Sequence, residues 1–377
     1  MLWIMTLTGI SLALAVCVVL NQAKFGGKPE GARLQRLQAS PHYADGEFRN
    51  TIPTPALAEG QSSLKIMLKG LFTKTERLRP AGPVPMVKTD LAGLAPSRDV
   101  FIWLGHSSYY IQLGGKRILV DPVFSEYASP FSFANRIFPG TGLYTADDMP
   151  EIDVLLISHD HWDHLDYPTV MALSEKVATV VVPLGVGAHF ERWGYPAGKI
   201  VEADWWDVLP VNDSDCTIHV VPARHYSGRS FTRNKTLWAG FVLESNGRRI
   251  FLSGDSGYGP HIAAIGSRFN GFDLAAIDGG QFDARWPLIH MTPEEAARAA
   301  EDLQAKKLLL THAGRFAIAA HAWDEPFTRA VAASEGRNGS LVTPQMGEPL
   351  WFDEPDQTFS HWWEGIDGAG KRPGQEK

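Results

Sequence analysis

The stretch SHDHWDH, from Ser158 to His164, places three histidines and two aspartates within seven residues. It continues the apolar run DVLLI, which is typical of a buried strand, so the polar side chains emerge where that strand ends. His159 and His161 are two residues apart, and in an extended turn both can face one cation. Asp163 and His164 come next and can face a second cation. Because histidine nitrogens and aspartate oxygens are common zinc ligands, the stretch predicts a metal site rather than a polar surface turn.

Three more ligand-type side chains follow apolar runs further along the chain. His225 follows TIHVVPAR, Asp255 follows RIFLSG and His312 follows KLLLT. Side chains delivered from several strand ends converge on one edge of a sheet, whereas ordinary surface residues would be scattered. The sequence therefore predicts two neighbouring groups of metal ligands: His159, His161 and His225 in one, Asp163, His164 and His312 in the other, with Asp255 between them.

Short apolar runs bounded by turn residues extend through most of the chain after residue 98, among them VFIWLG, YYIQLGG, WAGFVLE and FDLAAID. Thr292, Pro293 and Glu295 fit an N-cap, a first-turn proline and a capping-box glutamate, which predicts a helix start. Two β-rich halves with covering helices predict an α/β layered sandwich over residues 98–355, followed by a tail over 356–377. Helices are expected near Pro168–Lys176, Pro260–Phe269 and Thr292–Ala305.

The HxHxDH pattern, with a later His, Asp and His, resembles that of the metallo-β-lactamase fold hydrolases, from about Val100 to Phe352. Several further stretches together resemble N-acyl-phosphatidylethanolamine-hydrolysing phospholipase D and its bacterial relatives: WLGHSS, VDPVFS, SHDHWDHLDYPTV, EADWWDVLP, SGDSGY, FDLAAI and MTPEEAARA. The resemblance implies a four-layer αββα sandwich that binds two zinc ions, with Asp255 as the carboxylate that bridges them. Ligands of this kind without thiolate suit zinc but also admit iron or manganese.

Single residues carry over from the resemblance as well. His290 matches a histidine near the scissile phosphate in that family, and His321 matches another active-site histidine. His106 in WLGHSS is expected to hold a ligand through a hydrogen bond. The chain departs from the family in two places: HAGRFAI follows the last ligand in place of an aromatic-containing stretch, and Asp278 stands where the phospholipase has an apolar residue. Both departures touch the pocket rather than the metal set, so they leave the exact substrate open.

The chemistry expected of this site is hydrolysis. Two divalent ions about 3.5–4 Å apart would lower the pKa of a shared water and polarise a bound phosphodiester. Asp163 is expected to be both a ligand and the hydrogen-bond acceptor that orients the resulting hydroxide. His290 precedes a predicted helix N-terminus, where an anion is favoured, and is the candidate for phosphate contact or leaving-group protonation.

The predicted reaction is cleavage of an N-acylphosphatidylethanolamine-type phospholipid to phosphatidic acid and an N-acylethanolamine, in the manner of a phospholipase D. A lactonase or other ester hydrolase of the same fold is an alternative, because the same hydroxide attacks a carbonyl carbon. A membrane-tethered zinc-binding module that does not turn over is an alternative of another class.

Residues Leu2 to Leu20 form a run of 19 uncharged, mostly apolar residues. As a helix rising roughly 1.5 Å per residue, this run nearly matches a hydrocarbon layer of about 30 Å. Residues 1–22 are therefore predicted to be a membrane anchor, with a cleaved signal peptide as the alternative. The nearest basic residues all follow the run, which by the positive-inside tendency places the catalytic domain in the cytoplasm and leaves a periplasmic or extracellular domain open.

Residues 23–97 are rich in Gly, Pro, Lys and Arg and are predicted to be an extended arm with a short helix around Ser63–Phe72. A second irregular segment, Tyr127–Tyr144, is a long aromatic insertion shortly before the metal-binding strand. Its side chains are expected either to line an acyl-chain groove near a phosphate or to pack against one another: Phe131, Phe133, Arg136, Ile137 and Phe138.

The charge of the chain bears on its partners. The formal net charge is −7, and no block rich in Lys or Arg is present. A duplex nucleic-acid binder needs a basic face to replace the counterions around phosphates, so nucleic acid is not expected as a partner. The expected partner is a phospholipid in a membrane, and a homodimer is left open. The two cysteines, Cys17 and Cys216, allow no disulfide framework.

Overall fold

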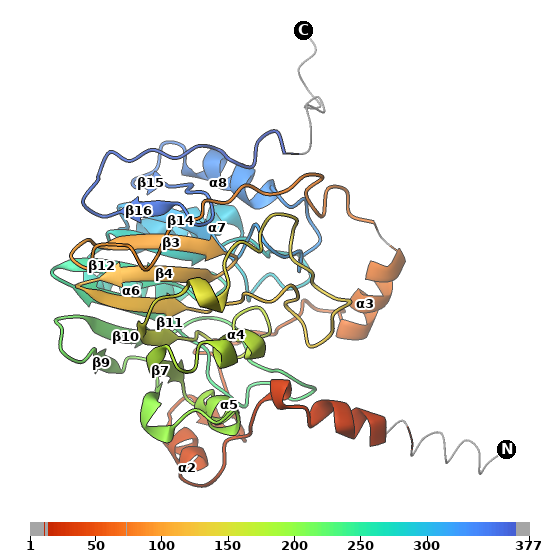
Figure 1. Cartoon of the computed structure of the whole chain (residues 1–377). Helices are drawn as coiled ribbons and strands as arrows, with labels where there is room; N and C mark the ends of the chain where they lie inside the picture. Colours follow the sequence, from red (N-terminus) through yellow and green to blue (C-terminus); the bar gives the residue numbers. More distant parts are fainter. Residues whose placement is uncertain (1–10, 12–13, 73, 367–377) are drawn as a thin grey trace.

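Two seven-stranded sheets form the centre of the computed structural model, which describes residues 11, 14–72 and 74–366 (Figure 1). The strand order in the first sheet is β16 (Pro349–Trp351), β3 (Val100–Gly105), β4 (Ser108–Leu113), β5 (Lys116–Val120), β6 (Ile152–Leu156), β7 (Val177–Pro183) and β8 (Ile200–Ala203). The order in the second is β15 (Ser340–Leu341), β14 (Lys307–Thr311), β13 (Leu274–Asp278), β12 (Arg248–Leu252), β11 (Gly240–Ser245), β10 (Thr217–Val221) and β9 (Val208–Pro210).

Strand direction decides where the polar side chains after each strand emerge. In the second sheet β12, β13 and β14 pair in parallel, and β10 and β12 are both antiparallel to β11. These four strands therefore run the same way, and their carboxyl ends lie along one edge of the sheet. In the first sheet β5, β6 and β7 are likewise parallel, so β6 delivers the SHDHWDH stretch at an edge of its own sheet.

The core lies between the two sheets and continues on both outer faces. Along β3, Phe101 and Trp103 belong to the cluster between the sheets, whereas Val100 and Ile102 pack on the other face. Such strands are buried on both sides, which explains why they read as nearly continuous apolar runs. Each fully buried side chain of this kind stabilises the fold by roughly 1.5–3 kcal/mol.

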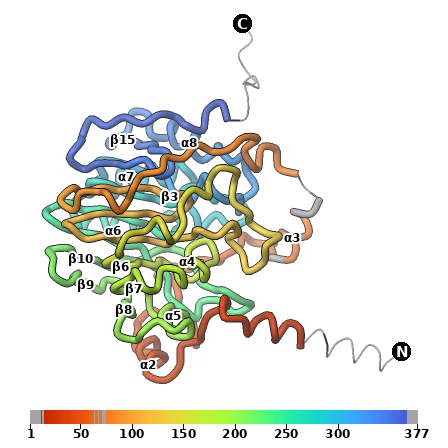
Figure 2. The backbone as a smooth tube through the Cα atoms, in the orientation of Figure 1, coloured from red at the N-terminus to blue at the C-terminus, as the bar shows by residue number. Residues whose placement is uncertain are grey.

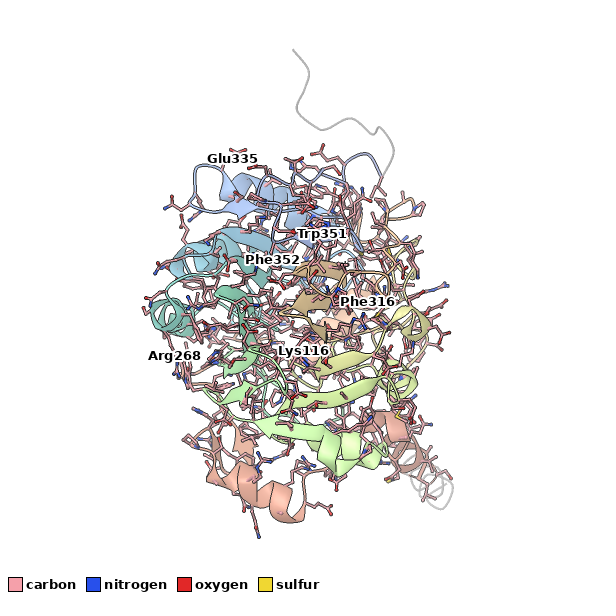
Figure 3. All side chains as sticks on the ribbon, turned by 60° about the vertical axis from the view of Figure 1, so that its left-hand side comes forward. Lys116, Arg268, Phe316, Glu335, Trp351 and Phe352 are labelled. Atoms are coloured by element: carbon pink, nitrogen blue, oxygen red, sulfur yellow. The ribbon has the colours of Figure 1, made fainter. Side chains whose placement is uncertain are left out.

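Helices cover both outer faces. On the first sheet, Val170 of α4 (Tyr167–Ala172) and Phe190 of α5 (Gly187–Arg192) pack with the strands. On the second sheet the cover consists of α6 (Pro260–Phe269), α7 (Pro293–Asp302) and α8 (Glu325–Ser334). Arg268 of α6 marks this outer side in Figure 3. The predicted order of layers, αββα, is confirmed. The remaining helical turns are η1 (Ala23–Phe25), η2 (Ala146–Asp148) and η3 (Ala197–Lys199).

The predicted start of α7 is also confirmed. Thr292 Oγ1 accepts a hydrogen bond from the backbone N–H of Glu295 at 3.2 Å, and the Glu295 carboxylate accepts one from the backbone N–H of Thr292 at 2.9 Å. This reciprocal capping satisfies two amide groups that the helix itself leaves free. It fixes the first turn of α7 directly after His290.

The segment 23–97 wraps around the sandwich. It contains α2 (Gly31–Ala39), a hairpin of β1 (Tyr43–Ala44) and β2 (Glu47–Phe48), and α3 (Ser63–Phe72), which confirms the short helix expected there. Leu37 and Phe48 are fully buried in the main core. The segment therefore contributes apolar surface to the domain, although its sequence has the composition of an irregular arm.

The two ends of the chain differ in how much of them the structure describes. Residues 1–10 and 12–13, most of the predicted anchor, lie outside the described residues. Across the residues that are described, none of the helices combines the length and apolar character needed to span a bilayer. At the other end, within the predicted tail, Trp362 and Trp363 are buried against Phe327 of α8.

Candidate metal centre

The metal-binding loop, Ser158–Leu165, is a tight turn at the end of β6. The carbonyl of His161 accepts hydrogen bonds from the backbone N–H groups of His164 at 3.2 Å and Leu165 at 2.8 Å. The loop is fixed at its start by Asp121, whose carboxylate accepts from the backbone N–H of Ser158 at 2.7 Å and from its hydroxyl at 2.5 Å. The side chains that the sequence predicts as ligands are therefore held on a short, rigid turn.

The first predicted ligand group is assembled around His161. Its Nδ1 lies 2.8 Å from Nε2 of His159 and 3.2 Å from Nε2 of His225. Oδ2 of Asp255 lies 3.7 Å from Nε2 of His159 and 3.6 Å from Nε2 of His225. Burial holds the pKa of both His159 and His225 well below the ordinary histidine value. Both rings are therefore neutral near pH 7, which is the form that binds a metal.

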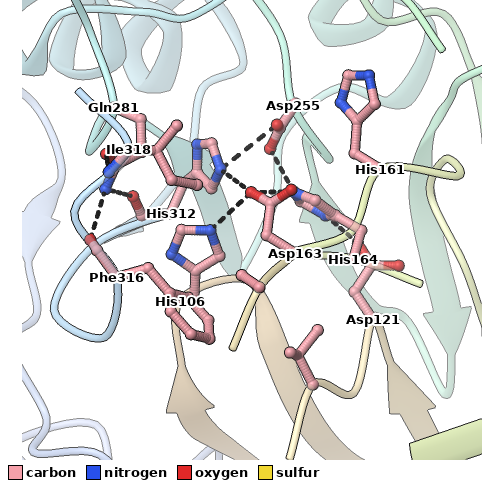
Figure 4. Close-up of polar contacts among 12 residues, drawn as sticks. His106, Asp121, His161, Asp163, His164, Asp255, Gln281, His312, Phe316 and Ile318 are labelled. Carbon is pink, nitrogen blue, oxygen red and sulfur yellow. Dashed lines mark hydrogen bonds and ion pairs between the residues drawn. The ribbon is translucent and has the colours of Figure 1, made fainter. Parts of the chain in front are cut away.

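The residues of the second predicted group, Asp163, His164 and His312, lie together beside Asp255 in Figure 4. Nε2 of His312 is 3.1 Å from Oδ2 of Asp163 and 3.4 Å from Oδ2 of Asp255. Nε2 of His164 is 3.0 Å from Oδ1 of Asp255 and 3.6 Å from Oδ2 of Asp163. Asp255 thus contacts both groups. All seven residues predicted from the sequence meet in one place, and Asp255 stands between the two sets.

The residues of the second group fit a divalent cation. Nδ1 of His164 lies 2.8 Å from the Asp121 carboxylate and donates to it, so Nε2 is the nitrogen that faces Asp163 and Asp255. Nε2 of His164 and Oδ1 of Asp255 are buried and have no hydrogen-bond partner, although they are 3.0 Å apart. In the neutral ring Nε2 carries a lone pair, and a buried lone pair facing carboxylates is costly unless a proton or a metal cation lies between them.

The electrostatics of this group support the same reading. Burial opposes the charged form of His164, but Asp255 and Asp163 raise its pKa well above the ordinary value. Burial also opposes the charged form of His312, yet Asp255 and Asp278 raise its pKa to about 10. The carboxylates therefore attract positive charge into the group, as protons when no metal is present. A divalent ion would displace those protons.

Three of the ligand histidines, His164, His225 and His312, are oriented by a partner on Nδ1. Nδ1 of His164 faces Asp121, and Nδ1 of His225 donates to the Ile289 carbonyl at 3.0 Å. Nδ1 of His312 lies 3.1 Å from Oδ1 of Asp278. Such contacts fix the ring orientation and the tautomer of a metal ligand.

His106 lies where the sequence places it, with Nε2 3.0 Å from Oδ2 of Asp163. Burial opposes the ionised form of Asp163, but His164 and the hydrogen bonds from His106 and His312 keep the pKa of its carboxyl well below the ordinary value. Asp163 is therefore an anion at neutral pH.

Asp121 is a residue of the site that sequence reasoning missed. It stands directly after β5, just as His225, Asp255 and His312 follow apolar runs. That same signal, an acidic residue at a strand end, could have found it. Asp278 was noted only as a departure from the phospholipase pattern, yet it ends β13 and contacts His312.

The two predicted catalytic histidines lie in different places. His290 is buried beside the ligands: its ring centroid is 5.0 Å from those of His225 and His312, and its Nδ1 is 2.8 Å from Oδ2 of Asp278. His321 instead stacks on Phe282, with ring centroids 4.4 Å apart. Its Nδ1 lies 2.9 Å from the carbonyl oxygen of Ala322. It lines a small neighbouring cavity with Gln281 and Phe316 rather than facing the ligand groups.

The aromatic insertion is divided between core and surface. Phe138 is buried against Trp323, at 6.3 Å between ring centroids, and lines the small cavity beside His321. Phe131 and Phe133 stack on each other at 5.3 Å and are exposed to solvent. Arg136 is largely exposed and lies 3.6 Å from Glu126. Phe131 and Phe133 are therefore the aromatic side chains of the insertion that are available to a substrate or a membrane.

Comparison with known proteins identifies the family. Residues 116–313, which include all seven predicted ligand positions, match the family described as the beta-lactamase superfamily domain. The chain belongs to this superfamily. It is a metal-dependent hydrolase of the metallo-β-lactamase fold.

Individual relatives are consistent with that assignment. An uncharacterized protein of Mycobacterium tuberculosis is 37% identical over 332 residues, which cover 86% of this chain and 88% of the relative. The mitochondrial N-acyl-phosphatidylethanolamine-hydrolyzing phospholipase D of Saccharomyces cerevisiae is 32% identical over 263 residues, covering 67% of this chain and 55% of the relative. The structure of a metallo hydrolase from Ignicoccus hospitalis shares the fold, with a TM-score of 0.51 at 19% identity over 68% of this chain and 98% of that one.

Proposed function

We propose that this chain is a dizinc phosphodiesterase of the phospholipase D type, which hydrolyses N-acylphosphatidylethanolamine-type phospholipids to phosphatidic acid and an N-acylethanolamine. The observation that carries the proposal is the pair of ligand groups that share Asp255. The similarity to a yeast enzyme named for this reaction supports the choice of substrate. Because that similarity covers little more than half of the yeast protein, the substrate stays a proposal.

The residues around the ligand groups suit this reaction. Two divalent ions, when bound, would supply an activated water and polarise the phosphodiester. Asp163 is held as an anion by His164 and by the hydrogen bonds from His106 and His312, and it can accept a hydrogen bond from the attacking water. His290 has its Nδ1 occupied by Asp278, so its Nε2 is the nitrogen left for a phosphate oxygen or the departing alcohol. That leaving oxygen needs a proton once the phosphorus–oxygen bond breaks.

A phospholipid substrate requires contact with a bilayer. Several large apolar side chains are exposed: Leu14, Val16, Val18, Leu64, Leu68, Phe131, Phe133 and Phe231. The first five lie on the N-terminal helix and α3, which project on the same side in Figure 1. Nζ of Lys24 lies 5.6 Å from the ring centroid of Phe131, which adds a cation beside the aromatic tip. Exposed apolar groups rimmed by cations fit an anionic membrane surface. We propose that this side faces the lipid.

The test is mass spectrometry of lipid products after the full chain, loaded with two zinc ions, meets N-acylphosphatidylethanolamine vesicles. Asp255→Asn removes the shared carboxylate charge, and Asp353→Asn, which alters an exposed ion pair with Arg98, is the matched control. Phosphatidic acid should form with the parent and with Asp353→Asn but not with Asp255→Asn. Intact lipid in the presence of two bound metals would refute the proposed substrate, and lactones and other esters would then be assayed. Inactivity towards those as well would favour a binding module.

A further inference from the structure

A strap of backbone, Ala23–Gly27, runs beside the metal-binding loop and is tied to it by Arg229. The Arg229 side chain is buried, with 4% of its surface exposed. Nη1 donates to the backbone carbonyls of Asp160 at 2.9 Å and Leu165 at 2.6 Å, and Nη2 and Nε donate to the carbonyl of Lys24 at 2.9 and 3.3 Å. One guanidinium therefore joins two ends of the metal-binding loop to the strap.

Trp162, in the middle of the metal-binding loop, makes the second contact with this arrangement. The Arg229 guanidinium carbon lies 3.9 Å from the centroid of the Trp162 ring. Phe25 of the strap meets the same ring edge-on, with centroids 5.2 Å apart and planes at 82°. Trp162 stands between His161 and Asp163 in the sequence, so its position bears directly on both ligands.

The strap is itself held against α5, past which it runs in Figure 2. Trp193 Nε1 donates to the Ala23 carbonyl at 2.7 Å, and Arg192 Nη1 donates to the Gly26 carbonyl at 2.8 Å. Gly26 has a φ of +77°, and a Cβ there would lie 1.9 Å from Nδ1 of His189. Only glycine fits at this point, because any larger residue would push the strap away from α5.

The chemistry of Arg229 explains why this residue type is needed. Buried carbonyl groups must be hydrogen-bonded, and a planar guanidinium has five donors and a face that stacks on an aromatic ring. Lysine could reach one carbonyl but could not stack in the same way. The neighbouring loop is secured by Asp160, whose carboxylate accepts from the Gly228 N–H at 2.7 Å and from the Thr236 hydroxyl at 3.0 Å. Asp160 is ionised at neutral pH and interacts electrostatically with the Arg229 guanidinium.

We propose that Arg229 and the strap position the metal-binding loop, so that the four ligands on this loop keep the geometry needed to bind two divalent ions. Arg229 acts through the backbone of the loop and is a positioning residue. The segment that directly follows the predicted anchor would then be a working part of the metal centre. This inference rests on the proposed metal binding and not on the lipid substrate.

The experiment measures Co²⁺ binding to the full chain by competition with a chelator, together with the visible spectrum of the bound Co²⁺ and the Tm of the metal-free protein. Arg229→Gln removes the clamp, Arg229→Lys keeps only the charge, and Gly26→Ala displaces the strap while leaving Arg229 in place. Gly31→Ala is the matched control, since Gly31 also has a positive φ, +54°, but a Cβ there meets nothing within 4 Å.

Arg229→Gln and Gly26→Ala should bind Co²⁺ roughly 10–100-fold more weakly, with an altered spectrum, as expected when groups that orient ligands are lost. Arg229→Lys should recover part of the affinity, and Gly31→Ala should match the parent. A fall in Tm with unchanged affinity and spectrum would show a purely structural role and overturn the proposal. If Arg229→Gln fails to fold, the Co²⁺ affinities of Gly26→Ala and Gly31→Ala test the proposal: equal affinities would overturn it. A parent chain that binds no Co²⁺ would overturn the metal binding itself, whereas inactivity on lipid alone would leave this inference standing.

Discussion

Asp278 Oδ2 lies 2.8 Å from Nδ1 of His290, and this buried pair stands directly beside the metal ligands. The other carboxylate oxygen lies 3.1 Å from Nδ1 of the ligand His312. Burial favours the protonated acid, but His290 and His312 outweigh it and keep the pKa of Asp278 below the ordinary value. An ionised Asp278 can only accept hydrogen bonds, so both rings carry their proton on Nδ1. One carboxylate thereby orients a ligand and the candidate proton donor together.

Replacing Asp278 with asparagine should impair both functions at once. The amide can accept from only one ring through its single oxygen, so one histidine loses its orientation. We expect metal affinity to fall by roughly 10–100-fold, with a comparable loss in kcat on whichever substrate the enzyme turns over. Chelator competition and steady-state kinetics measure the two effects. Parent-like values in both assays would contradict the role given to Asp278.

Asp121→Asn should affect one metal more than the other. Asp121 contacts Nδ1 of His164 directly, at 2.8 Å. It reaches the first group only through the Ser158 hydroxyl, which lies 3.0 Å from Nδ1 of His159. We expect bound metal to fall from two ions towards one per chain under mild chelation. Metal analysis after dialysis checks this, with Asp302→Asn on α7 as control. Equal loss of both ions would count against the assignment.

The acid sensitivity of the metal-free protein should depend on His261. Burial and the charge of Arg224 lower the pKa of His261 to about 4, whereas an unfolded histidine titrates near 6.5. His261 therefore becomes protonated below about pH 6.5 in the unfolded chain, but only below about pH 4 in the folded chain. Stability from this residue is full above pH 6.5 and is lost as the pH falls towards 4.

The corresponding measurement is urea unfolding of the metal-free parent and of His261→Gln at pH 7 and pH 4.5. Between these values the parent should lose about 2–3 kcal/mol more free energy of unfolding than the variant. Using metal-free protein removes the separate effect of acid on metal binding. Identical losses would show that His261 titrates normally in the folded chain.

The exposed aromatic residues should govern membrane binding without affecting stability. Phe133 and Phe231 are 85% and 84% exposed, so replacing them removes little packing. We expect Phe133→Ser and Phe231→Ser each to weaken co-sedimentation with anionic phospholipid vesicles by about tenfold, from the apolar area no longer inserted. Val208→Ser is the matched control, because Val208 is 49% exposed on β9, an edge strand of the second sheet. Similar losses in all three variants would contradict a specific lipid-facing side.

Much of the fold and the ligand set could be predicted because both depend on local pattern. Each strand is an apolar run, and a ligand follows it where the chain emerges from the core, as with KLLLT and His312. The capping box of Thr292 and Glu295 is local as well. Segment 23–97 was harder to place, because its buried residues, such as Leu37 and Phe48, are isolated among polar ones and give no periodic signal.

The sequence by itself determined which side chains stand at strand ends, since a buried strand is a run of neighbouring apolar residues and the polar residue after it marks its end. Only the tertiary structure decided which of those ends meet. Arg229 and Lys24 are joined although 205 positions separate them, and Asp278 reaches His312 from an adjacent strand. Contacts of this kind depend on how two sheets and a wrapped N-terminal segment pack together. No local pattern records that packing, because it is set by the shape of the whole core.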